Sequence, residues 1–246
     1  MTKKQPSDYL ALALDNIDTL ADLTALIDKT HESVGVYKIG LEQFTRFGPP
    51  ILQPIRDRGR RIFLDLKFHD IPNTVAKAVA SACELGIDYL TLHTQGGLEM
   101  MKAAAQNARE MSGNVLKPLK LIGVTVLTSI SPDALAQELS VATPMPRHVR
   151  HLAELAMKAG LDGIVCSAAD LAEVKPALPD CAEIITPGIR PQGAAINDQK
   201  RIATPASAIR DGATLLVVGR PITQAADPAT AAKIIMAEIS IALGQG

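Results

Sequence analysis

The stretch Asp65-Leu66-Lys67-Phe68-His69-Asp70-Ile71-Pro72-Asn73-Thr74 joins the end of an apolar run to the start of a helix. Asp65 and Lys67 stand two positions apart, so on a strand both side chains leave the same face. Pro72 suits the first turn of a helix, where its missing N–H has no intrahelical partner to lose. Two carboxylates around one lysine at a strand's carboxyl end predict a device for proton transfer or charge stabilisation. The competing interpretation is a solvated salt-bridge patch.

The same alternation of strand and helix repeats along the whole chain. Near-continuous apolar runs are typical of parallel strands that are buried on both faces. Glycines such as Gly86, Gly160 and Gly212 end the helical patterns just before the next apolar run. The expected strands are Tyr9–Asp15, Val34–Ile39, Arg61–Asp65, Tyr89–His93, Lys120–Leu127, Gly163–Cys166, Glu183–Thr186 and Thr214–Val218.

Eight such units in 246 residues predict a single (β/α)8 TIM barrel, with residues 1–246 forming one catalytic domain. The main alternative is a doubly wound open sheet, which usually carries a glycine-rich first turn. The first expected strand instead ends at Asp15-Asn16-Ile17-Asp18, with no GxGxxG after it. No Pro- or Ser-rich linker interrupts the pattern, which favours one domain.

Composition excludes several classes of function. The chain is 47% hydrophobic and 21% charged, which is ordinary for a globular protein. A net charge of -1, no tryptophan and few other aromatic residues argue against a nucleic-acid partner. No apolar run is long enough to span a membrane, and the N-terminus lacks the apolar core of a signal peptide. Three cysteines without CxxC spacing are typical of reduced thiols, so a cytoplasmic protein is expected.

Active sites of TIM barrels lie at the carboxyl ends of the strands, so polar residues expected there are candidates. Lys38 is expected to meet Asp65 across neighbouring strands and to form a Lys-Asp-Lys-Asp array with Lys67 and Asp70. The strand-end candidates are Asp15, Lys38, Asp65, Lys67, His93, Thr128, Arg190, Gly219 and Arg220.

The loops after the last two expected strands predict a phosphate site. Thr186–Gly193 is rich in turn residues and contains Arg190. Gly219 and Arg220 precede a helix that is expected to begin at Pro221. TIM barrels recurrently bind phosphate at these two loops, and arginine adds charge-assisted hydrogen bonds to phosphate oxygens. The alternative is a pair of helix caps with solvent-facing arginines.

The sequence predicts no metal site. His148 and His151 lie on a basic helical segment and have no third ligand nearby in the sequence. His69 lies among the carboxylates, where a histidine is as often an orienting hydrogen-bond partner as a base. Neither a Walker motif nor a GxSxG nucleophile motif occurs.

From Leu14-Asp15 to Gly219-Arg220-Pro221-Ile222-Thr223, the chain resembles the orotidine 5'-phosphate decarboxylase family of bacterial type. The long ungapped match over residues 65–74 is the most specific part of this resemblance. Four further segments fall in the right order: Lys38-Ile39-Gly40, Val126-Leu127-Thr128-Ser129, Pro187-Gly188-Ile189-Arg190 and Asp198-Gln199.

The resemblance implies that orotidine 5'-monophosphate loses carbon dioxide to give uridine 5'-monophosphate, in de novo pyrimidine biosynthesis, without cofactor or metal. It implies that Lys67 is the catalytic lysine, that Lys38, Asp65 and Asp70 complete the charged array, and that Lys67 protonates the carbanion left at C6. The implied substrate-binding residues are Asp15, Lys38, Asp65, Thr74, Thr128, Arg190, Gln199, Gly219 and Arg220.

The resemblance further implies a homodimer in which Asp70 and Thr74 reach the neighbouring subunit's site, and a loop, Pro191–Gln199, that closes over the phosphate. Two other readings stay open. A sugar-phosphate decarboxylase or aldolase on a related barrel would share the Asp-x-Lys-x-x-Asp core but would depend on a divalent metal. A catalytically silent nucleotide-binding barrel would bind uridine 5'-monophosphate without turnover.

Overall fold

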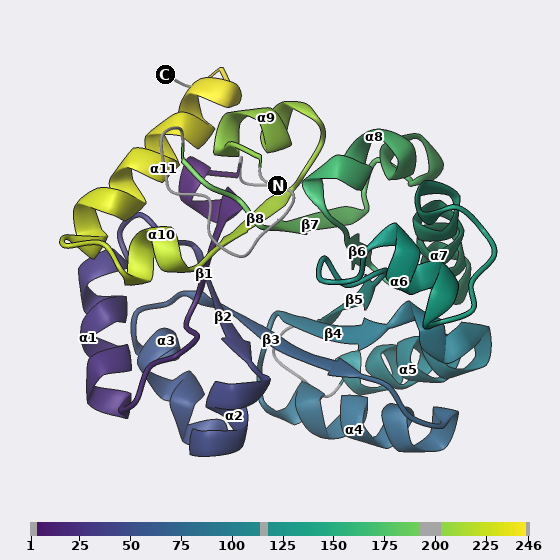
Figure 1. Ribbon diagram of the computed structural model, residues 1–246. Coiled ribbons are helices and arrows are strands. Elements are labelled where there is room, and N and C mark those ends of the chain that lie inside the picture. Colours follow the sequence, from purple (N-terminus) through teal and green to yellow (C-terminus); the bar gives the residue numbers. More distant parts are fainter. Residues whose placement is uncertain (1–3, 114–117, 192–202, 245–246) are drawn as a thin grey trace.

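Eight parallel strands close into a barrel in the order β1-β2-β3-β4-β5-β6-β7-β8 (Figure 1). The computed structural model describes residues 4–113, 118–191 and 203–244. Because β1 pairs with both β2 and β8, the sheet has no edge, and the predicted TIM barrel is confirmed over the open sheet. The strands are β1 (Leu10–Ala13), β2 (Val36–Gly40), β3 (Arg61–Phe68), β4 (Tyr89–His93), β5 (Lys120–Val124), β6 (Gly163–Val165), β7 (Glu183–Pro187) and β8 (Leu215–Val218).

Helices surround the barrel, and two of them begin or end at the proline and glycine that the sequence predicts. Pro72 occupies the first turn of α4 as expected, and Gly160 ends α7 in the left-handed conformation that glycine adopts readily. The α-helices are α1 (Leu20–Thr30), α2 (Leu41–Phe47), α3 (Gln53–Asp57), α4 (Pro72–Glu84), α5 (Gly97–Ser112), α6 (Pro132–Gln137), α7 (Met145–Ala159), α8 (Leu171–Val174), α9 (Pro205–Arg210), α10 (Arg220–Thr223) and α11 (Pro228–Ala242). Short 3-10 helices are η1 (Pro6–Tyr9), η2 (Pro49–Leu52), η3 (Thr94–Gly96), η4 (Ala168–Asp170) and η5 (Lys175–Ala177).

Several strand ends differ from those expected. β1 begins at Leu10 rather than Tyr9, because the Pro6 segment forms the helix η1 first. β5 ends at Val124, short of the expected Leu127. β3 continues to Phe68, past the expected end at Asp65, so Asp65 and Lys67 both lie within the strand. Arg220, rather than Pro221, is the first residue of α10.

The apolar core has two parts. A large cluster lies between the strands and the helices, and a smaller one fills the interior of the barrel, where Phe63 and Tyr89 meet edge to face with ring centroids 5.9 Å apart. The inner cluster consists of Ala11, Ala13, Val36, Phe63, Tyr89, Ile122, Ile185, Leu215 and Val217. The barrel is therefore packed below the level of its carboxyl end.

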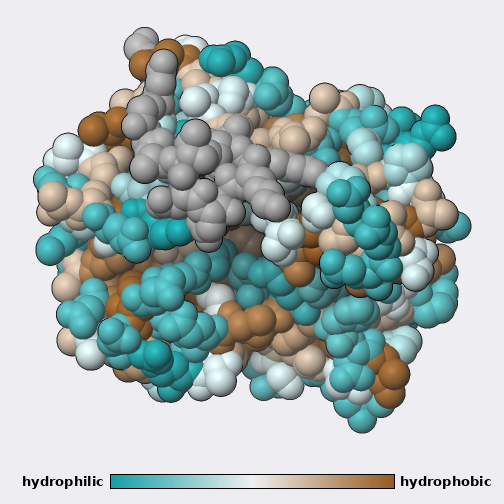
Figure 2. Space-filling view, viewed as in Figure 1, coloured by the Kyte–Doolittle hydropathy of each residue, from teal (hydrophilic) through white to brown (hydrophobic). Residues whose placement is uncertain are grey.

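The molecular surface is mixed in character. On the face shown in Figure 2, hydrophilic residues predominate and apolar residues form separate brown areas among them. Large apolar side chains exposed to solvent include Leu41 and Ile71, at the carboxyl ends of β2 and β3. Within the described ranges, no helix combines the length and the apolar character needed to cross a bilayer.

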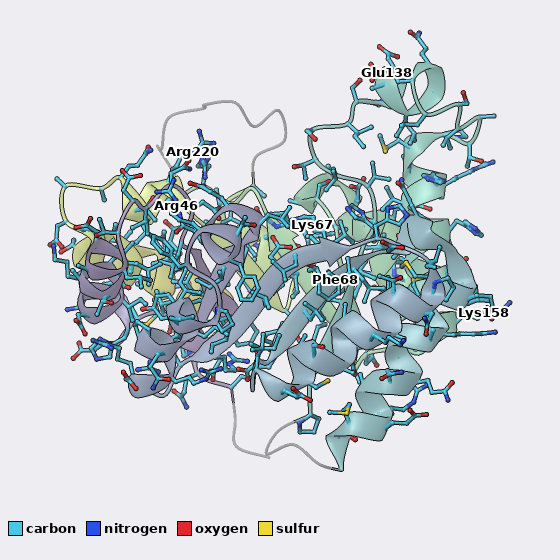
Figure 3. All side chains as sticks on the ribbon, turned by 90° about the horizontal axis from the view of Figure 1, so that it is seen from below. Arg46, Lys67, Phe68, Glu138, Lys158 and Arg220 are labelled. Carbon is cyan, nitrogen blue, oxygen red and sulfur yellow. The ribbon has the colours of Figure 1, made fainter. Side chains whose placement is uncertain are left out.

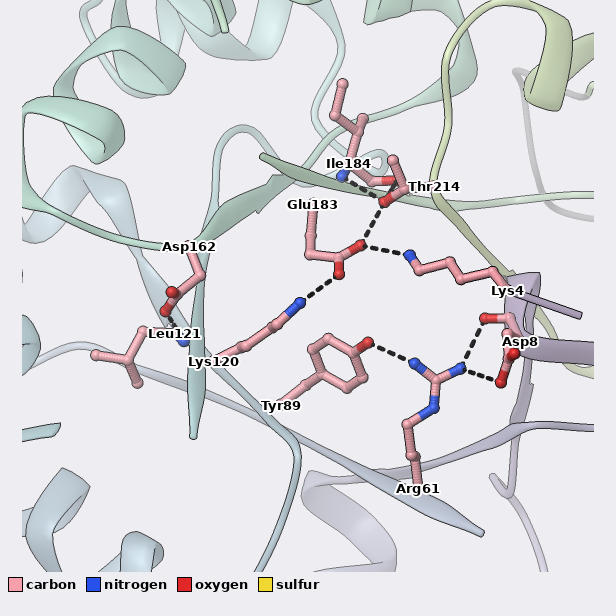
Figure 4. A network of polar contacts seen from close by, with 10 residues as sticks. All are labelled: Lys4, Asp8, Arg61, Tyr89, Lys120, Leu121, Asp162, Glu183, Ile184 and Thr214. Atoms are coloured by element: carbon pink, nitrogen blue, oxygen red, sulfur yellow. Dashed lines mark hydrogen bonds and ion pairs between the residues drawn. The ribbon is translucent and has the colours of Figure 1, made fainter. Parts of the chain in front are cut away.

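A polar network closes the amino end of the barrel (Figure 4). The buried carboxylate of Glu183 accepts hydrogen bonds from Lys120 Nζ at 2.6 Å and from the Thr214 hydroxyl at 2.7 Å, and Lys4 Nζ lies 3.5 Å away. Arg61 bonds to Tyr89 beside it. A buried charge is costly unless it is paired, so these contacts stabilise the fold. Active sites of TIM barrels lie at the opposite, carboxyl end of the strands.

The charge of Glu183 makes stability depend on pH. Burial alone would raise the pKa of Glu183, but bonds from Lys120 and Thr214 and the nearby Lys4 ammonium outweigh burial and hold the pKa below its ordinary value. A lowered pKa stabilises the fold above the unfolded value of about 4.3, and that stabilisation is lost as the pH falls through the folded pKa.

We therefore expect Glu183→Gln to lower the free energy of unfolding at neutral pH by about 1 to 3 kcal/mol, because charged hydrogen bonds are lost. The deficit relative to wild type should shrink as the pH falls below the ordinary carboxyl range. Urea unfolding at a series of pH values measures both effects. Glu154→Gln, which breaks only the exposed Arg150–Glu154 pair of α7, is the matched control and should cost less than about 0.5 kcal/mol. A deficit that does not vary with pH would contradict this account.

Candidate active site

An irregularity in β3 brings the residues of the key stretch together. Leu64 pairs with Leu90 and Phe68 pairs with Leu92, so Asp65, Leu66 and Lys67 all lie opposite Thr91 of β4. Lys67 has a φ of 50°, a left-handed conformation that is uncommon for a residue other than glycine. Asp65 and Lys67 do converge, but through this bulge rather than through the regular alternation of side chains along a strand.

Four charged side chains, from β2, β3 and the loop after β1, form a continuous array. Lys67 Nζ lies 2.8 Å from Asp65 Oδ2, and Lys38 Nζ lies 3.6 Å from the same oxygen. Lys38 Nζ also lies 3.1 Å from Asp15 Oδ1. The side chains of Lys38 and Asp65 are only 10% and 12% exposed, whereas that of Lys67 is 28% exposed. Lys67 is thus the ammonium of the array that is more open to a ligand.

The pKa of Asp65 reflects its two lysine neighbours. Burial alone would raise this pKa, but the ammonium groups of Lys38 and Lys67, together with hydrogen bonds from Lys67 and Thr91, outweigh burial and lower it. The carboxylate is therefore ionised throughout the neutral range and keeps both ammonium groups in place.

Two adjoining cavities open beside the array. The larger, of about 560 Å³, is lined by Asp15, Lys38, Arg190, Gly219 and Arg220 among others. The smaller, of about 170 Å³, lies over Lys67 and has mainly apolar walls, and both cavities share Lys38, Pro187 and Val217. The apolar walls of the smaller cavity are Phe63, Val124, Val126, Leu127, Val165, Ile185 and Val217.

Arg190 and Arg220 line the larger cavity from the segments that follow β7 and β8. Arg190 is only 6% exposed, which is rare for an arginine, and Arg220 begins α10 directly after Gly219. Figure 3 shows Lys67 near the middle of the molecule and Arg220 above and to the left of it. The lining of the larger cavity therefore combines these two guanidinium groups with Asp15 and Lys38 of the array.

Most of the residues expected from the sequence line these cavities. Thr128 borders the smaller cavity from the loop after β5. Asp70 and Thr74 do not join the array: both are exposed, and Asp70 accepts a hydrogen bond from the Ile71 backbone N–H at 2.6 Å. Gln199, and the segment Pro191–Gln199 beyond Pro191, lie outside the described residues.

Sequence reasoning missed Thr91. Its hydroxyl donates a hydrogen bond to Asp65 Oδ1 at 2.9 Å and accepts one from the backbone N–H of Lys67, also at 2.9 Å. The available signal was a single polar residue inside the apolar run Tyr89-Leu90-Thr91-Leu92. The apolar walls of the smaller cavity were also missed, because inward-facing strand residues look like ordinary core in a sequence.

The histidines have no evident metal-binding arrangement. His69 packs against His93, with ring centroids 5.4 Å apart, and burial together with the nearby His69 and Lys67 lowers the pKa of His93. In the described part of the chain, no group of three or more His, Cys, Asp or Glu side chains is arranged to hold a metal ion. The absence of a metal or cofactor from the reaction stays a prediction.

We expect Lys38→Met to raise the pKa of Asp65, because one of its two ammonium neighbours is removed while the volume of the side chain is kept. The stabilisation that depends on ionised Asp65 should then be lost at a higher pH than in wild type. Carbon-13 NMR titration of aspartate carboxyl groups, with Asp65→Asn to assign the signal, measures the shift. Lys102→Met, which removes the partner of Glu99 on α5, should leave that titration unchanged. An unmoved Asp65 signal in Lys38→Met would show that Lys38 is not coupled to it.

Known proteins are similar to this sequence over nearly its whole length. It is 43% identical over 242 residues to the orotidine 5'-phosphate decarboxylase of Moorella thermoacetica, which covers 98% of this chain and 96% of that protein. It is 46% identical to the enzyme of the same name from Nostoc, covering 95% of this chain and 98% of that protein.

The fold agrees with these relatives. The crystal structure of orotidine 5'-phosphate decarboxylase from Lactobacillus acidophilus matches with a TM-score of 0.82 and 36% identity, covering 94% of this chain and 98% of that one. Residues 8–235 match the family described as "Orotidine 5'-phosphate decarboxylase / HUMPS family". The family resemblance expected from the sequence is confirmed, and the chain belongs to the orotidine 5'-phosphate decarboxylase / HUMPS family.

Proposed function

We propose that the protein converts orotidine 5'-monophosphate to uridine 5'-monophosphate and carbon dioxide, a step of pyrimidine biosynthesis. The bond between C6 and the carboxylate breaks, its electron pair stays on C6, and carbon dioxide leaves. A proton from the Lys67 ammonium then goes to C6, and solvent returns a proton to the lysine. The relatives at 43% and 46% identity, both named orotidine 5'-phosphate decarboxylase, support this assignment.

The Lys67–Asp65–Lys38 array is the observation that carries the mechanism. The electron pair left on C6 lies in the plane of the ring and has no neighbouring group to delocalise it. Stabilisation must therefore come from a fixed positive charge, and an ammonium held by a buried carboxylate beside a largely apolar cavity provides one. Because the chain itself supplies the cations that balance Asp65, we propose that the reaction needs no cofactor and no metal.

The two cavities suggest how the nucleotide lies. We propose that its phosphate binds Arg190, Gly219 and Arg220, since guanidinium groups form strong hydrogen bonds with phosphate oxygens. The ribose then lies against Asp15 and Lys38, and the pyrimidine enters the smaller cavity with Thr128 at its edge and C6 facing Lys67. Gln199, on the resemblance alone, is assigned to the phosphate as well.

We also propose a homodimer in which Asp70 and Thr74 contribute to the partner's site. Both residues are exposed, and so is the neighbouring Ile71, which is 65% exposed. Exposed apolar side chains are typical of surfaces that bind another protein when they are grouped. Asp70 makes no ion pair among the described residues, which leaves its carboxylate available to a cationic group of a second subunit. We place the reaction in the cytoplasm, in keeping with three unpaired cysteines.

The ultraviolet absorbance of orotidine 5'-monophosphate should decay with the wild-type protein, and EDTA should not slow it. Lys67→Ala should lower kcat by about 1,000-fold or more, because both the charge and the proton donor are lost, while uridine 5'-monophosphate still binds. Lys158→Ala, an exposed lysine of α7, is the matched control and should be fully active.

No decay with folded wild-type protein would reject the proposed reaction. Decay of a sugar phosphate that depends on added magnesium would favour the metal-dependent relatives instead. Binding of uridine 5'-monophosphate without any turnover would favour a silent nucleotide-binding barrel.

Mixing inactive Lys67→Ala and Asp70→Ala proteins should restore activity if each site combines Lys67 of one chain with Asp70 of the other. At equilibrium half of the dimers are hybrids and one of their two sites is intact, so about a quarter of wild-type activity is expected. Each variant mixed with itself is the control. Subunit exchange verified by mass spectrometry, without any recovery, would mean that Asp70 acts in its own chain.

A further inference from the structure

Thr91 occupies an unusual position in the barrel. It lies in the middle of β4 and is completely buried. The pairing of β3 with β4 changes register between Leu64 and Phe68, so that three residues of β3 face this single threonine. Such a bulge leaves backbone groups of the longer strand without their usual partners in the ladder.

The hydroxyl of Thr91 provides the missing connection. It accepts the backbone N–H of Lys67 at 2.9 Å, and it donates to Asp65 Oδ1 at 2.9 Å. The other oxygen of Asp65, Oδ2, receives Lys67 Nζ at 2.8 Å. One hydroxyl therefore fixes the backbone from which Lys67 projects and the carboxylate that holds its ammonium group.

Lys67 needs such support because its backbone is in the left-handed region, with a φ of 50°. Residues with a Cβ adopt this region rarely, and it persists where surrounding contacts hold it. Regular strand geometry at Lys67 would aim the side chain differently with respect to Asp65. The direction of the ammonium group thus depends on contacts made by the bulge.

We propose that Thr91 is a positioning residue for the decarboxylation, acting through Asp65 and Lys67 without touching the substrate. This inference rests on the proposed function, because it assigns Thr91 to the reaction at that same site. Its hydroxyl sets the distance and direction from the Lys67 ammonium to C6. Since a misplacement of about 1 Å costs roughly 100-fold in rate, loss of the hydroxyl should affect kcat far more than binding.

The barrel contains a close counterpart of Thr91 at its opposite end. The hydroxyl of Thr214 accepts the backbone N–H of Ile184 at 2.8 Å and donates to the carboxylate of Glu183 at 2.7 Å. Both threonines thus join a backbone N–H and a buried carboxylate of the preceding strand. Thr214 belongs to the network of Figure 4 and does not line the smaller cavity, which Lys67 borders.

This pair allows a controlled experiment with Thr91→Val, Thr91→Ser and Thr214→Val. Valine keeps the shape of threonine and removes the hydroxyl, whereas serine keeps the hydroxyl. Steady-state decarboxylation gives kcat and KM, calorimetric titration with uridine 5'-monophosphate gives the affinity of the folded site, and urea unfolding gives stability.

We expect Thr91→Val to lower kcat by about 10- to 100-fold while KM and product affinity change by less than about threefold. Thr91→Ser should return kcat to within about threefold of wild type. Thr214→Val should be destabilised, as Thr91→Val is, yet keep kcat within about twofold of wild type, because its hydroxyl supports no part of the site.

Three results would overturn the proposal: near-normal kcat in Thr91→Val, failure of serine to restore it, or a matching fall in product affinity, which indicates general disruption. If Thr91→Val does not fold, Thr91→Ala is compared with Thr91→Ser in the same way. An inactive wild-type protein would reject the proposed function itself. An active wild type with an unaffected Thr91→Val would reject only the role of Thr91.

Discussion

The buried carboxylate of Asp65 is the constraint on which the site depends. A carboxylate removed from water is strongly unfavourable unless it is paired, and here two lysines and one threonine surround it. These partners come from the three adjacent strands β2, β3 and β4, so the pairing of these strands brings them together. Asp65 thus holds the ammonium groups of Lys38 and Lys67 at the carboxyl end of the barrel. A substrate can reach Lys67, the more exposed of the two.

The amino acid sequence predicts the barrel well because each strand is buried on both faces. Such strands appear as apolar runs, and the glycine-terminated helices between them, such as the one ending at Gly160, mark each unit. Polar residues at strand ends, such as Lys38 and Arg190, stand out against these runs and were found for that reason. The sequence predicts a start of β1 at Tyr9, one residue early, because the apolar Tyr9 directly precedes the strand although it ends the helix η1.

Other parts of the site could not be predicted from local patterns. The bulge opposite Thr91 depends on how β3 and β4 are aligned, and its two bonded residues, Lys67 and Thr91, are 24 positions apart in the sequence. The alternation of side chains within one strand does not reveal a change in its register with the next. Asp70 follows the same strand as Asp65 and Lys67, yet in the described chain its carboxylate accepts a hydrogen bond from the Ile71 backbone N–H and does not join the array. Inward-facing residues such as Val217 serve both as core and as cavity wall, and sequence periodicity cannot separate these two roles.

The inner core also determines on which side of the barrel a ligand fits. Around the barrel interior, β1 contributes only the small residues Ala11 and Ala13, whereas β3 and β4 contribute Phe63 and Tyr89. Ala13 borders the larger cavity, and Phe63 forms a wall of the smaller one. The small side chains of β1 accompany the larger cavity, which lies toward β1 and β8, whereas the bulky Phe63 borders the smaller one. The floor of the cavity is therefore a property of the most stable part of the fold, and side-chain size there sets how deep a ligand can enter before any loop is involved.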